Sequence, residues 1–176
     1  MKIIILDVES EGLDENQHRV LELAMLAVEV PTFEVVAEFS QCVRIERIPD
    51  GLDPYVFRMH RESGLWMDCL RSERTLAQVE AAACAFVDQH THGDGPLGGA
   101  NLAFDRRFLV AQLPLLARRF HYRNLDVRTL TYLDEWIVGA PKEAPAHRAL
   151  GDCRQAVRAV ELHYERMAEA YARPSR

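Results

Sequence analysis

The chain has 176 residues, of which 48% are hydrophobic and 27% are charged. This length suffices for one full core and is too short for two typical domains, and the composition argues against disordered, collagen-like and membrane-spanning chains. Acidic residues outnumber basic ones by 27 to 21, a net charge of −6 that excludes the broad basic field of a protein coating long duplexes. We expect a soluble protein with one domain over residues 1–172 and a short tail over 173–176.

The N-terminus and the cysteines favour a cytoplasmic location. The apolar run at residues 3–6 is interrupted by acids at once, so it is neither a signal peptide nor a membrane span. The cysteines form no CxxC pair and have no histidine partner at zinc-ligand spacing. We therefore expect reduced, mostly buried thiols at Cys42, Cys69, Cys84 and Cys153.

Three strand patterns begin the chain. Residues 3–8 form a short buried run, residues 19–30 are apolar and branched, and residues 34–45 alternate between polar and apolar. Pro31 and Thr32 make a turn between the last two strands. These patterns predict a three-stranded antiparallel meander.

Helices then alternate with short strands. A helical pattern begins at Asp53, and a capping box over residues 75–78 begins a further helix. The later elements are, in order, a loop over 90–95, a strand over 96–100, a helix through Asp105 that ends or kinks near Pro114, a strand over 125–127, a loop over 139–146 and a long helix over 150–171. This order predicts an α/β protein with a mixed sheet covered by helices.

Two acids stand at the end of the first strand. Asp7 and Glu9 are two residues apart, so their carboxylates project from the same face of the strand. Unpaired burial of these charges would be costly, and a hard divalent cation with oxygen ligands removes that cost. The alternative is that both acids lie beyond the strand in solvent, and the motif alone leaves both interpretations open.

Two further acids fit the same kind of site. Asp105 lies among apolar residues, where a helix can direct its carboxylate inward or pair it with Arg106 and Arg107. Asp152 lies in the first turns of the terminal helix, five residues after His147. The electrostatics of a helix start also favour an acid there, so each residue taken singly has an ordinary explanation.

Together these residues follow the order D-x-E, N-x-x-x-D and H-x-x-x-x-D, where the asparagine is Asn101. This combination resembles the DEDDh group of 3′-to-5′ exonucleases over residues 3–167. The resemblance implies the ribonuclease H-like fold, a mixed five-stranded sheet with an antiparallel meander first, then parallel strands, and flanking helices. It also implies two divalent metal ions, Mg²⁺ or Mn²⁺, and a histidine general base that takes a proton from the attacking water. The catalytic set is then His147 with the metal ligands Asp7, Glu9, Asp105 and Asp152.

Three other stretches resemble one branch of this group, the oligoribonucleases, which degrade RNA fragments of two to a few nucleotides. The stretches are DVESEGLD at 7–14, MHRESGL at 59–65 and HYRNLDVRTL at 121–130. The resemblance implies that Leu13 wedges between two bases, Tyr55 provides a stacking platform and His60 contacts the substrate. For Leu13 and Tyr55 the alternative is packing in the core.

The third stretch also implies a limit on substrate length and a homodimer. Arg123 and Thr129 correspond to residues that bind the 5′ phosphate of a dinucleotide, for which an arginine fork is suited. Tyr122 corresponds to a residue that reaches into the site of a neighbouring subunit.

The chain departs from oligoribonucleases at three positions. Arg128 and Asn101 stand where that branch has serines, and Glu11 stands where a threonine is usual. Arg128 either strengthens the phosphate cap or fills it, and Glu11 repels phosphate unless it points away or helps to hold metal. Asn101 instead matches the wider group, including DNA-proofreading and tRNA-trimming exonucleases.

The sequence therefore predicts a 3′-to-5′ exoribonuclease that hydrolyses very short single-stranded RNA, from dinucleotides upward, to 5′-mononucleotides. The first alternative is a DEDDh exonuclease acting on longer single-stranded DNA or RNA 3′ ends. The second is a catalytically silent protein that binds nucleic-acid ends. The complete set of four acids favours an enzyme, because a binding protein has no need of them.

Overall fold

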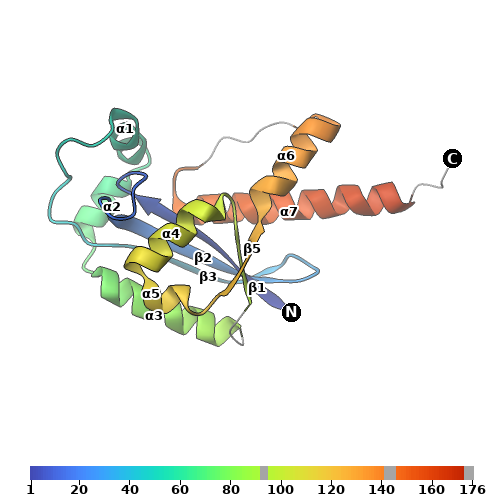
Figure 1. Ribbon diagram of the computed structural model, residues 1–176, viewed down its shortest axis with the longest axis horizontal. Coiled ribbons are helices and arrows are strands. Elements are labelled where there is room, and N and C mark those ends of the chain that lie inside the picture. Colours follow the sequence, from blue (N-terminus) through green and yellow to red (C-terminus); the bar gives the residue numbers. More distant parts are fainter. Residues whose placement is uncertain (92–94, 141–145, 173–176) are drawn as a thin grey trace.

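A computed structural model describes residues 1–91, 95–140 and 146–172. Five strands form one mixed sheet in the order β3-β2-β1-β4-β5, with helices on both faces (Figure 1). The strands are β1 (Lys2–Ser10), β2 (Val20–Glu29), β3 (Val35–Cys42), β4 (Pro96–Gly99) and β5 (His121–Asp126). The first three are antiparallel neighbours, whereas β4 pairs in parallel with β1 and with β5. The predicted fold class is thus confirmed.

Seven helices accompany the sheet in the described residues. They are α1 (Pro54–Glu62), α2 (Leu65–Arg71), α3 (Leu76–His90), α4 (Leu102–Gln112), α5 (Pro114–Ala117), α6 (Val127–Val138) and α7 (Ala149–Ala172). The predicted capping box at Thr75 and Gln78 is present at the start of α3. Three predicted segments lie wholly or partly outside the described residues: 92–94 of the loop over 90–95, 141–145 of the loop over 139–146, and the tail at 173–176.

The prediction of a strand over residues 125–127 is wrong in its bounds. The strand β5 runs over His121–Asp126, and Val127 already begins helix α6. The change occurs at Asp126 because its carboxylate accepts a 3.0 Å hydrogen bond from the Arg128 amide and so caps the helix.

The two faces of β1 have different partners. Ile4, Leu6 and Val8 pack in a core with α3, α4 and α5, whereas Ile3 and Ile5 pack on the other face, in a core with α7. Because successive side chains alternate, the next two positions on the α7 face are those of Asp7 and Glu9. The acid pair therefore continues an apolar stripe toward the start of α7.

Two glycines allow β4 to approach β1 closely. A Cβ atom at Gly98 would lie 2.5 Å from the Ile5 Cδ1 atom, and one at Gly99 would lie 2.5 Å from the Leu6 carbonyl oxygen. A larger residue at Gly99 would meet backbone and push β4 away, whereas one at Gly98 would first require the end of the Ile5 side chain to shift. This approach brings the beginning of α4 next to the acidic end of β1.

A third core fixes α1 and α2 at the end of the sheet. Trp66 and Cys69 of α2 pack with Leu21 of β2, and the His60 Nε2 atom lies 2.8 Å from the Ser10 carbonyl oxygen. Within the described part of the chain, no helix has the length and apolar character needed to span a membrane. The four cysteines are free thiols; three are buried and Cys42 is half-buried, as predicted.

Candidate active site

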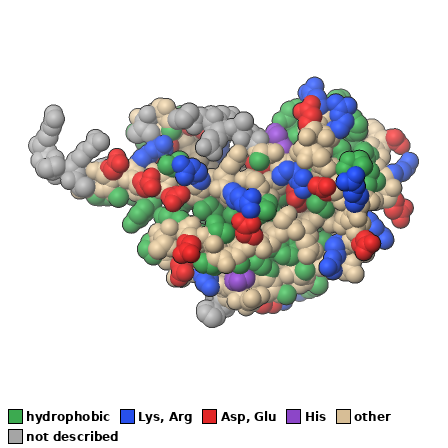
Figure 2. Space-filling view, turned by 180° about the vertical axis from the view of Figure 1, so that it is seen from behind, with side chains coloured by type: hydrophobic (Ala, Val, Ile, Leu, Met, Phe, Trp, Pro, Cys, Tyr) green, Lys and Arg blue, Asp and Glu red, His purple; other side chains and the backbone are tan. Residues whose placement is uncertain are grey.

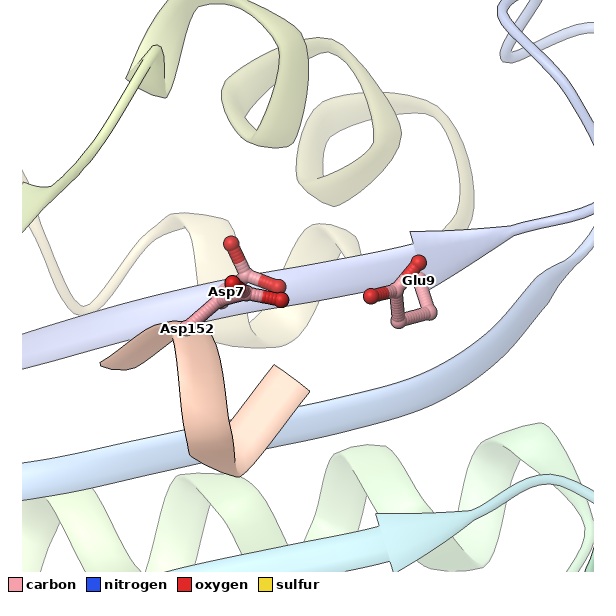
Figure 3. Close-up of side chains that lie close together, drawn as sticks. All are labelled: Asp7, Glu9 and Asp152. Atoms are coloured by element: carbon pink, nitrogen blue, oxygen red, sulfur yellow. The ribbon is translucent and has the colours of Figure 1, made fainter. Parts of the chain in front are cut away.

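Three carboxylates converge at the C-terminal end of β1. Asp7 and Glu9 project from the strand, and Asp152 projects toward them from the first turns of α7 (Figure 3). One oxygen from each side chain lies within 4.8 Å of those of the other two. The three acids thus meet because successive side chains of β1 point to opposite faces of the sheet, and α7 packs on the face that carries Asp7 and Glu9.

Burial and mutual repulsion raise the pKa values of this group. Burial, then Asp152 and Glu22, raise the pKa of Glu9 to about 8. Burial, followed by Asp105 and Glu9, raises the pKa of Asp7 well above its usual value. Oxygen donors crowded in this way are the ligand set of Mg²⁺ or Mn²⁺, and such an ion removes the repulsion. The residues present therefore fit a divalent metal.

The fourth acid lies beside this group. Asp105 of α4 is only 2% exposed, and its Oδ1 atom accepts a 2.9 Å hydrogen bond from the Val8 amide. Burial raises the pKa of Asp105 to about 7. Asp105 lies outside the three-residue group, but its charge is the strongest electrostatic influence on Asp7 after burial.

The ordinary explanation for Asp105, pairing with its neighbours, is wrong. The Arg106 guanidinium donates to Asn124, and Arg107 forms an ion pair with Glu15. Neither arginine compensates the buried carboxylate.

Asp126 caps the helix that carries Asp105 and was not identified from the sequence as a site residue. Besides capping α6, its carboxylate accepts hydrogen bonds from the amides of Asn101 (3.1 Å) and Leu102 (3.0 Å), where α4 begins. Asn101 itself has a left-handed backbone and no side-chain capping bond. The signal available in the sequence was an aspartate directly before a helical pattern. This signal indicates the cap of α6 but not the cap of α4.

His147 directly follows a residue that contacts the carboxylate group. The preceding residue, Ala146, donates a 2.8 Å hydrogen bond from its amide to the Asp152 Oδ1 atom. The centre of the His147 ring lies 6.4 Å from the centre of the Tyr55 ring. Together with α1 they line a hollow of about 350 Å³, whose lining residues are Tyr55, Arg58, Met59, Glu62, Ser63, Ala146 and His147. The histidine and the aromatic ring thus face one space.

The expected substrate contacts fall into exposed and buried residues. Leu13 and Tyr55 are 73% and 56% exposed, so the alternative of core packing is wrong for both. His60 is fully buried and its ring packs edge-on against Trp66, so substrate contact by this side chain stays a prediction.

The expected phosphate cap is only partly open. Arg123 and Thr129 are exposed near the junction of β5 and α6. Arg128 instead donates a 3.1 Å hydrogen bond to Glu135, and its guanidinium carbon lies 3.9 Å from the centre of the Tyr132 ring. The Arg128 side chain is therefore occupied along its own helix.

Glu11, another position at which the chain departs from oligoribonucleases, is paired with an arginine. Glu11 is buried and accepts hydrogen bonds from the backbone and side chain of Arg19, so its charge is compensated. Acidic and basic side chains are interspersed over the face shown in Figure 2, without a continuous basic surface. This pattern fits a local contact with nucleic acid.

Sequence reasoning also missed an ion pair beside the site, in which a buried glutamate binds a partly exposed arginine. Glu22 of β2 lies opposite Glu9 in the sheet and pairs with Arg148, the residue after His147. An acid within the apolar run of β2 was a visible signal, but its partner is 126 positions away.

Comparison with known proteins places this site in a family. Residues 4–160 match the model of the exonuclease family (RNase_T). An oligoribonuclease from Xylella fastidiosa is 34% identical over 178 residues, which cover 97% of this chain and 91% of that protein.

Two solved structures share the fold. The nuclease domain of 3′hExo, a DEDDh family member bound to rAMP, aligns with a TM-score of 0.64 at 17% identity, covering 93% of this chain and 92% of that one. Escherichia coli exonuclease I with a dT13 oligonucleotide aligns with a TM-score of 0.66 at 13% identity, covering 97% and 42%. The chain therefore shares the fold of a DEDDh nuclease, belongs to the exonuclease family and is a metal-dependent 3′-to-5′ exonuclease related to oligoribonucleases.

Proposed function

We propose that this exonuclease hydrolyses very short RNA, from dinucleotides upward, to 5′-mononucleotides, with two divalent ions and His147 as general base. The observation that carries the proposal is the grouping of three carboxylates within 4.8 Å beside a hollow lined by both His147 and Tyr55. Chemistry and base binding then take place in adjoining spaces.

Each side chain has a role that suits its position. Asp7, Glu9 and Asp152 would hold one ion, and Asp7 with Asp105 would hold the other. Bound divalent ions activate water and stabilise the entering and leaving oxygens of an in-line displacement. The His147 imidazole accepts the proton of the attacking water, a task for which histidine is suited near neutral pH.

The exposed residues support a short substrate. Tyr55 offers a stacking face and Leu13 an apolar edge, which bind bases without reading their sequence. Arg123 and Thr129 offer exposed donors for a terminal phosphate. The relative from Xylella fastidiosa carries the name oligoribonuclease, and the net charge of −6 suits a small substrate.

Longer single-stranded 3′ ends, of DNA or RNA, are the second candidate substrate. The observation that favours them is the engagement of Arg128 by Glu135 and Tyr132, which leaves fewer cationic groups to cap a short substrate. An open cap would let a longer strand pass.

We further propose a homodimer formed through β5 and α6. The strand β5 is at the sheet edge, and its Tyr122 is exposed. On α6, Trp136 and Ile137 are 74% and 76% exposed, and Trp136 stacks on Tyr132. An exposed apolar surface beside a free strand edge suits a second copy of the chain.

We also propose a cytoplasmic location, with which the free thiols are consistent.

A time course on three 5′-labelled substrates tests the substrate proposal. The protein with Mg²⁺, or with Mn²⁺, is given an RNA dinucleotide, an RNA of about twenty nucleotides and a matched single-stranded DNA, with EDTA as the control. Rapid loss of the dinucleotide with little attack on the long strands is the expected result. Preferential shortening of either long strand would establish the second candidate instead.

Sedimentation tests the dimer. The wild-type chain is expected to sediment as a dimer, and the double variant Trp136→Glu/Ile137→Glu as a folded monomer. The matched control is Val110→Glu/Leu115→Glu, which places the same charges at exposed apolar positions of α4 and α5. A monomeric wild-type protein would refute this interface.

A further inference from the structure

Glu22 is a buried carboxylate with a full set of partners. It is 1% exposed, and its two oxygens accept hydrogen bonds of 3.1 Å from the Arg148 Nε and Nη2 atoms. The Ala149 amide, at the start of α7, donates a third bond of 3.0 Å to the same carboxylate. Glu22 therefore binds an arginine fork and caps the helix that carries Asp152.

Arg148 joins this carboxylate to the wall of the hollow. Its guanidinium lies 2.9 Å from an Asp68 oxygen of α2 and donates a 3.3 Å bond to the Ser63 carbonyl at the end of α1. Arg148 thus connects β2, the α1–α2 unit and α7. The first pairs with the strand of Glu9, the second carries Tyr55 and the third carries Asp152.

The segment around His147 lies directly before Arg148. His147 has a backbone φ of +55°, a conformation that is unfavourable for a non-glycine residue and persists only where its surroundings impose it. On its C-terminal side lies Arg148, and on its N-terminal side the Ala146 amide is bound by Asp152. The Asp152 amide in turn donates to the Arg148 carbonyl oxygen, 3.0 Å away.

We propose that Glu22 and Arg148 are positioning residues of the exonuclease, which together fix His147 and Asp152 relative to Asp7 and Glu9. The inference rests on the proposed roles of His147 and Asp152. Neither Glu22 nor Arg148 need touch the substrate or a metal ion.

Stability alone does not explain the pair. Arg148 is one-third exposed, so solvent screens its attraction to Glu22, and burial of a carboxylate in such a pair is commonly no gain over apolar packing. A planar fork fixes direction as well as distance, and this geometric precision is what the pair adds.

The test compares the ion pair of Arg148, just before α7, with an ion pair made by a residue within α7. Glu22→Gln keeps the size and an acceptor, Arg148→Ala removes the fork, and Arg148→Lys keeps only the charge. Arg148 is one-third exposed, so its variants leave no large buried cavity. The matched control is Arg154→Ala, which removes an exposed ion pair between α7 and Glu38 of β3.

Two quantities are measured on each variant. The first is amide hydrogen exchange over residues 146–153 of the metal-free protein. The second is kcat and KM on whichever labelled 3′ end the wild type cleaves fastest. Glu22→Gln and Arg148→Ala are expected to speed exchange in this segment and to lower kcat about 10- to 100-fold, the cost of misplacing reacting groups by about 1 Å. Arg148→Lys is expected to recover only part of the loss, and Arg154→Ala to change neither quantity.

Several results would overturn the proposal. These are wild-type kcat in folded Glu22→Gln or Arg148→Ala, a loss confined to KM, or a lower kcat without faster exchange over residues 146–153. If the double variant Glu22→Gln/Arg148→Ala lowers kcat by the product of the two single-variant factors, the residues do not act as a unit. If the wild type cleaves no offered strand, the proposed function fails separately, and unchanged exchange in both variants still refutes the positioning role.

Discussion

The carboxylate of Asp105 accepts a 2.9 Å hydrogen bond from the amide of Val8, the residue between Asp7 and Glu9. This bond spans 97 positions and ties α4 to the acidic end of β1. Asp105 consequently has two separable functions. Any acceptor can satisfy the Val8 amide, whereas support of a metal ion beside Asp7 needs the negative charge.

Replacement of Asp105 separates these functions. Asp105→Asn keeps the acceptor, so we expect near wild-type stability but at least about 100-fold lower kcat, the size of effect of losing one electrostatic group in an active site. Asp105→Ala leaves the Val8 amide unpaired and is expected to cost a further ~1–3 kcal/mol of unfolding free energy. Chemical denaturation and initial rates measure both. An active Asp105→Asn enzyme would exclude Asp105 from the metal site.

The metal-free protein should lose stability as the pH rises. The pKa of Glu9 is about 8 in the folded protein against 4.5 for an ordinary glutamate, so between these values the folded state binds more protons than the unfolded state. Unfolding free energy therefore falls as pH rises through this window. Thermal unfolding in EDTA is expected to show a lower Tm at about pH 8 than at about pH 5, and excess Mg²⁺ to restore it.

Asp7→Asn is the control for that experiment. It removes one of the repelling charges, so its Tm in EDTA should fall less with pH, and its exonuclease activity should be lost. A Tm of the metal-free wild type that stays level or rises between about pH 5 and pH 8 would contradict the assignment of buried, mutually repelling carboxylates.

His147→Ala should impair the chemical step and spare binding. Loss of a general base lowers kcat by about 10²- to 10⁴-fold. Binding of a dinucleotide with a non-hydrolysable linkage, measured by calorimetry in Ca²⁺, should change little. His90→Ala, at the end of α3 against Phe86, is the control and should behave as wild type. Affinity that falls in parallel with kcat would assign His147 to binding instead.

Tyr55 should act through its ring. Base stacking contributes about 1–3 kcal/mol, so Tyr55→Ala is expected to raise KM for a dinucleotide by about 5- to 150-fold, whereas Tyr55→Phe keeps the ring and the affinity. Tyr171→Ala provides an exposed aromatic control near the end of α7. Equal KM values for the wild type and Tyr55→Ala would show that the bases bind elsewhere.

Arg123 and Arg128 should differ in how much they contribute to binding of a 5′ phosphate. Arg123 is exposed, so Arg123→Ala is expected to weaken binding of a 5′-phosphorylated dinucleotide by about tenfold or more, as for loss of a charged hydrogen bond. Arg128→Ala should have little effect, because Glu135 and Tyr132 already occupy its guanidinium. Competition binding with and without the 5′ phosphate measures both. A larger loss for Arg128→Ala would show that this side chain turns toward the substrate.

Local patterns in the sequence were enough for most of the fold, whereas the proposed catalytic set came from the resemblance of the combined motifs to a family, because each acid taken singly had an ordinary explanation. The alternating direction of side chains along β1 placed Asp7 and Glu9 on one face, and helical spacing placed Asp152 near the start of α7. The bounds of β5 could not be predicted, because this edge strand has mostly exposed side chains and therefore no burial pattern.

What the sequence by itself determined is which residue types stand at which positions of each strand and helix, since the periods of these elements and their caps depend on near neighbours. Only the tertiary structure decided which distant groups meet: Glu22 with Arg148, Asp126 with the start of α4, and Arg128 with its own helix rather than the cap. The physical reason is that buried charges take whichever partner the packing of strands and helices brings within hydrogen-bond distance. Sequence spacing does not encode that packing.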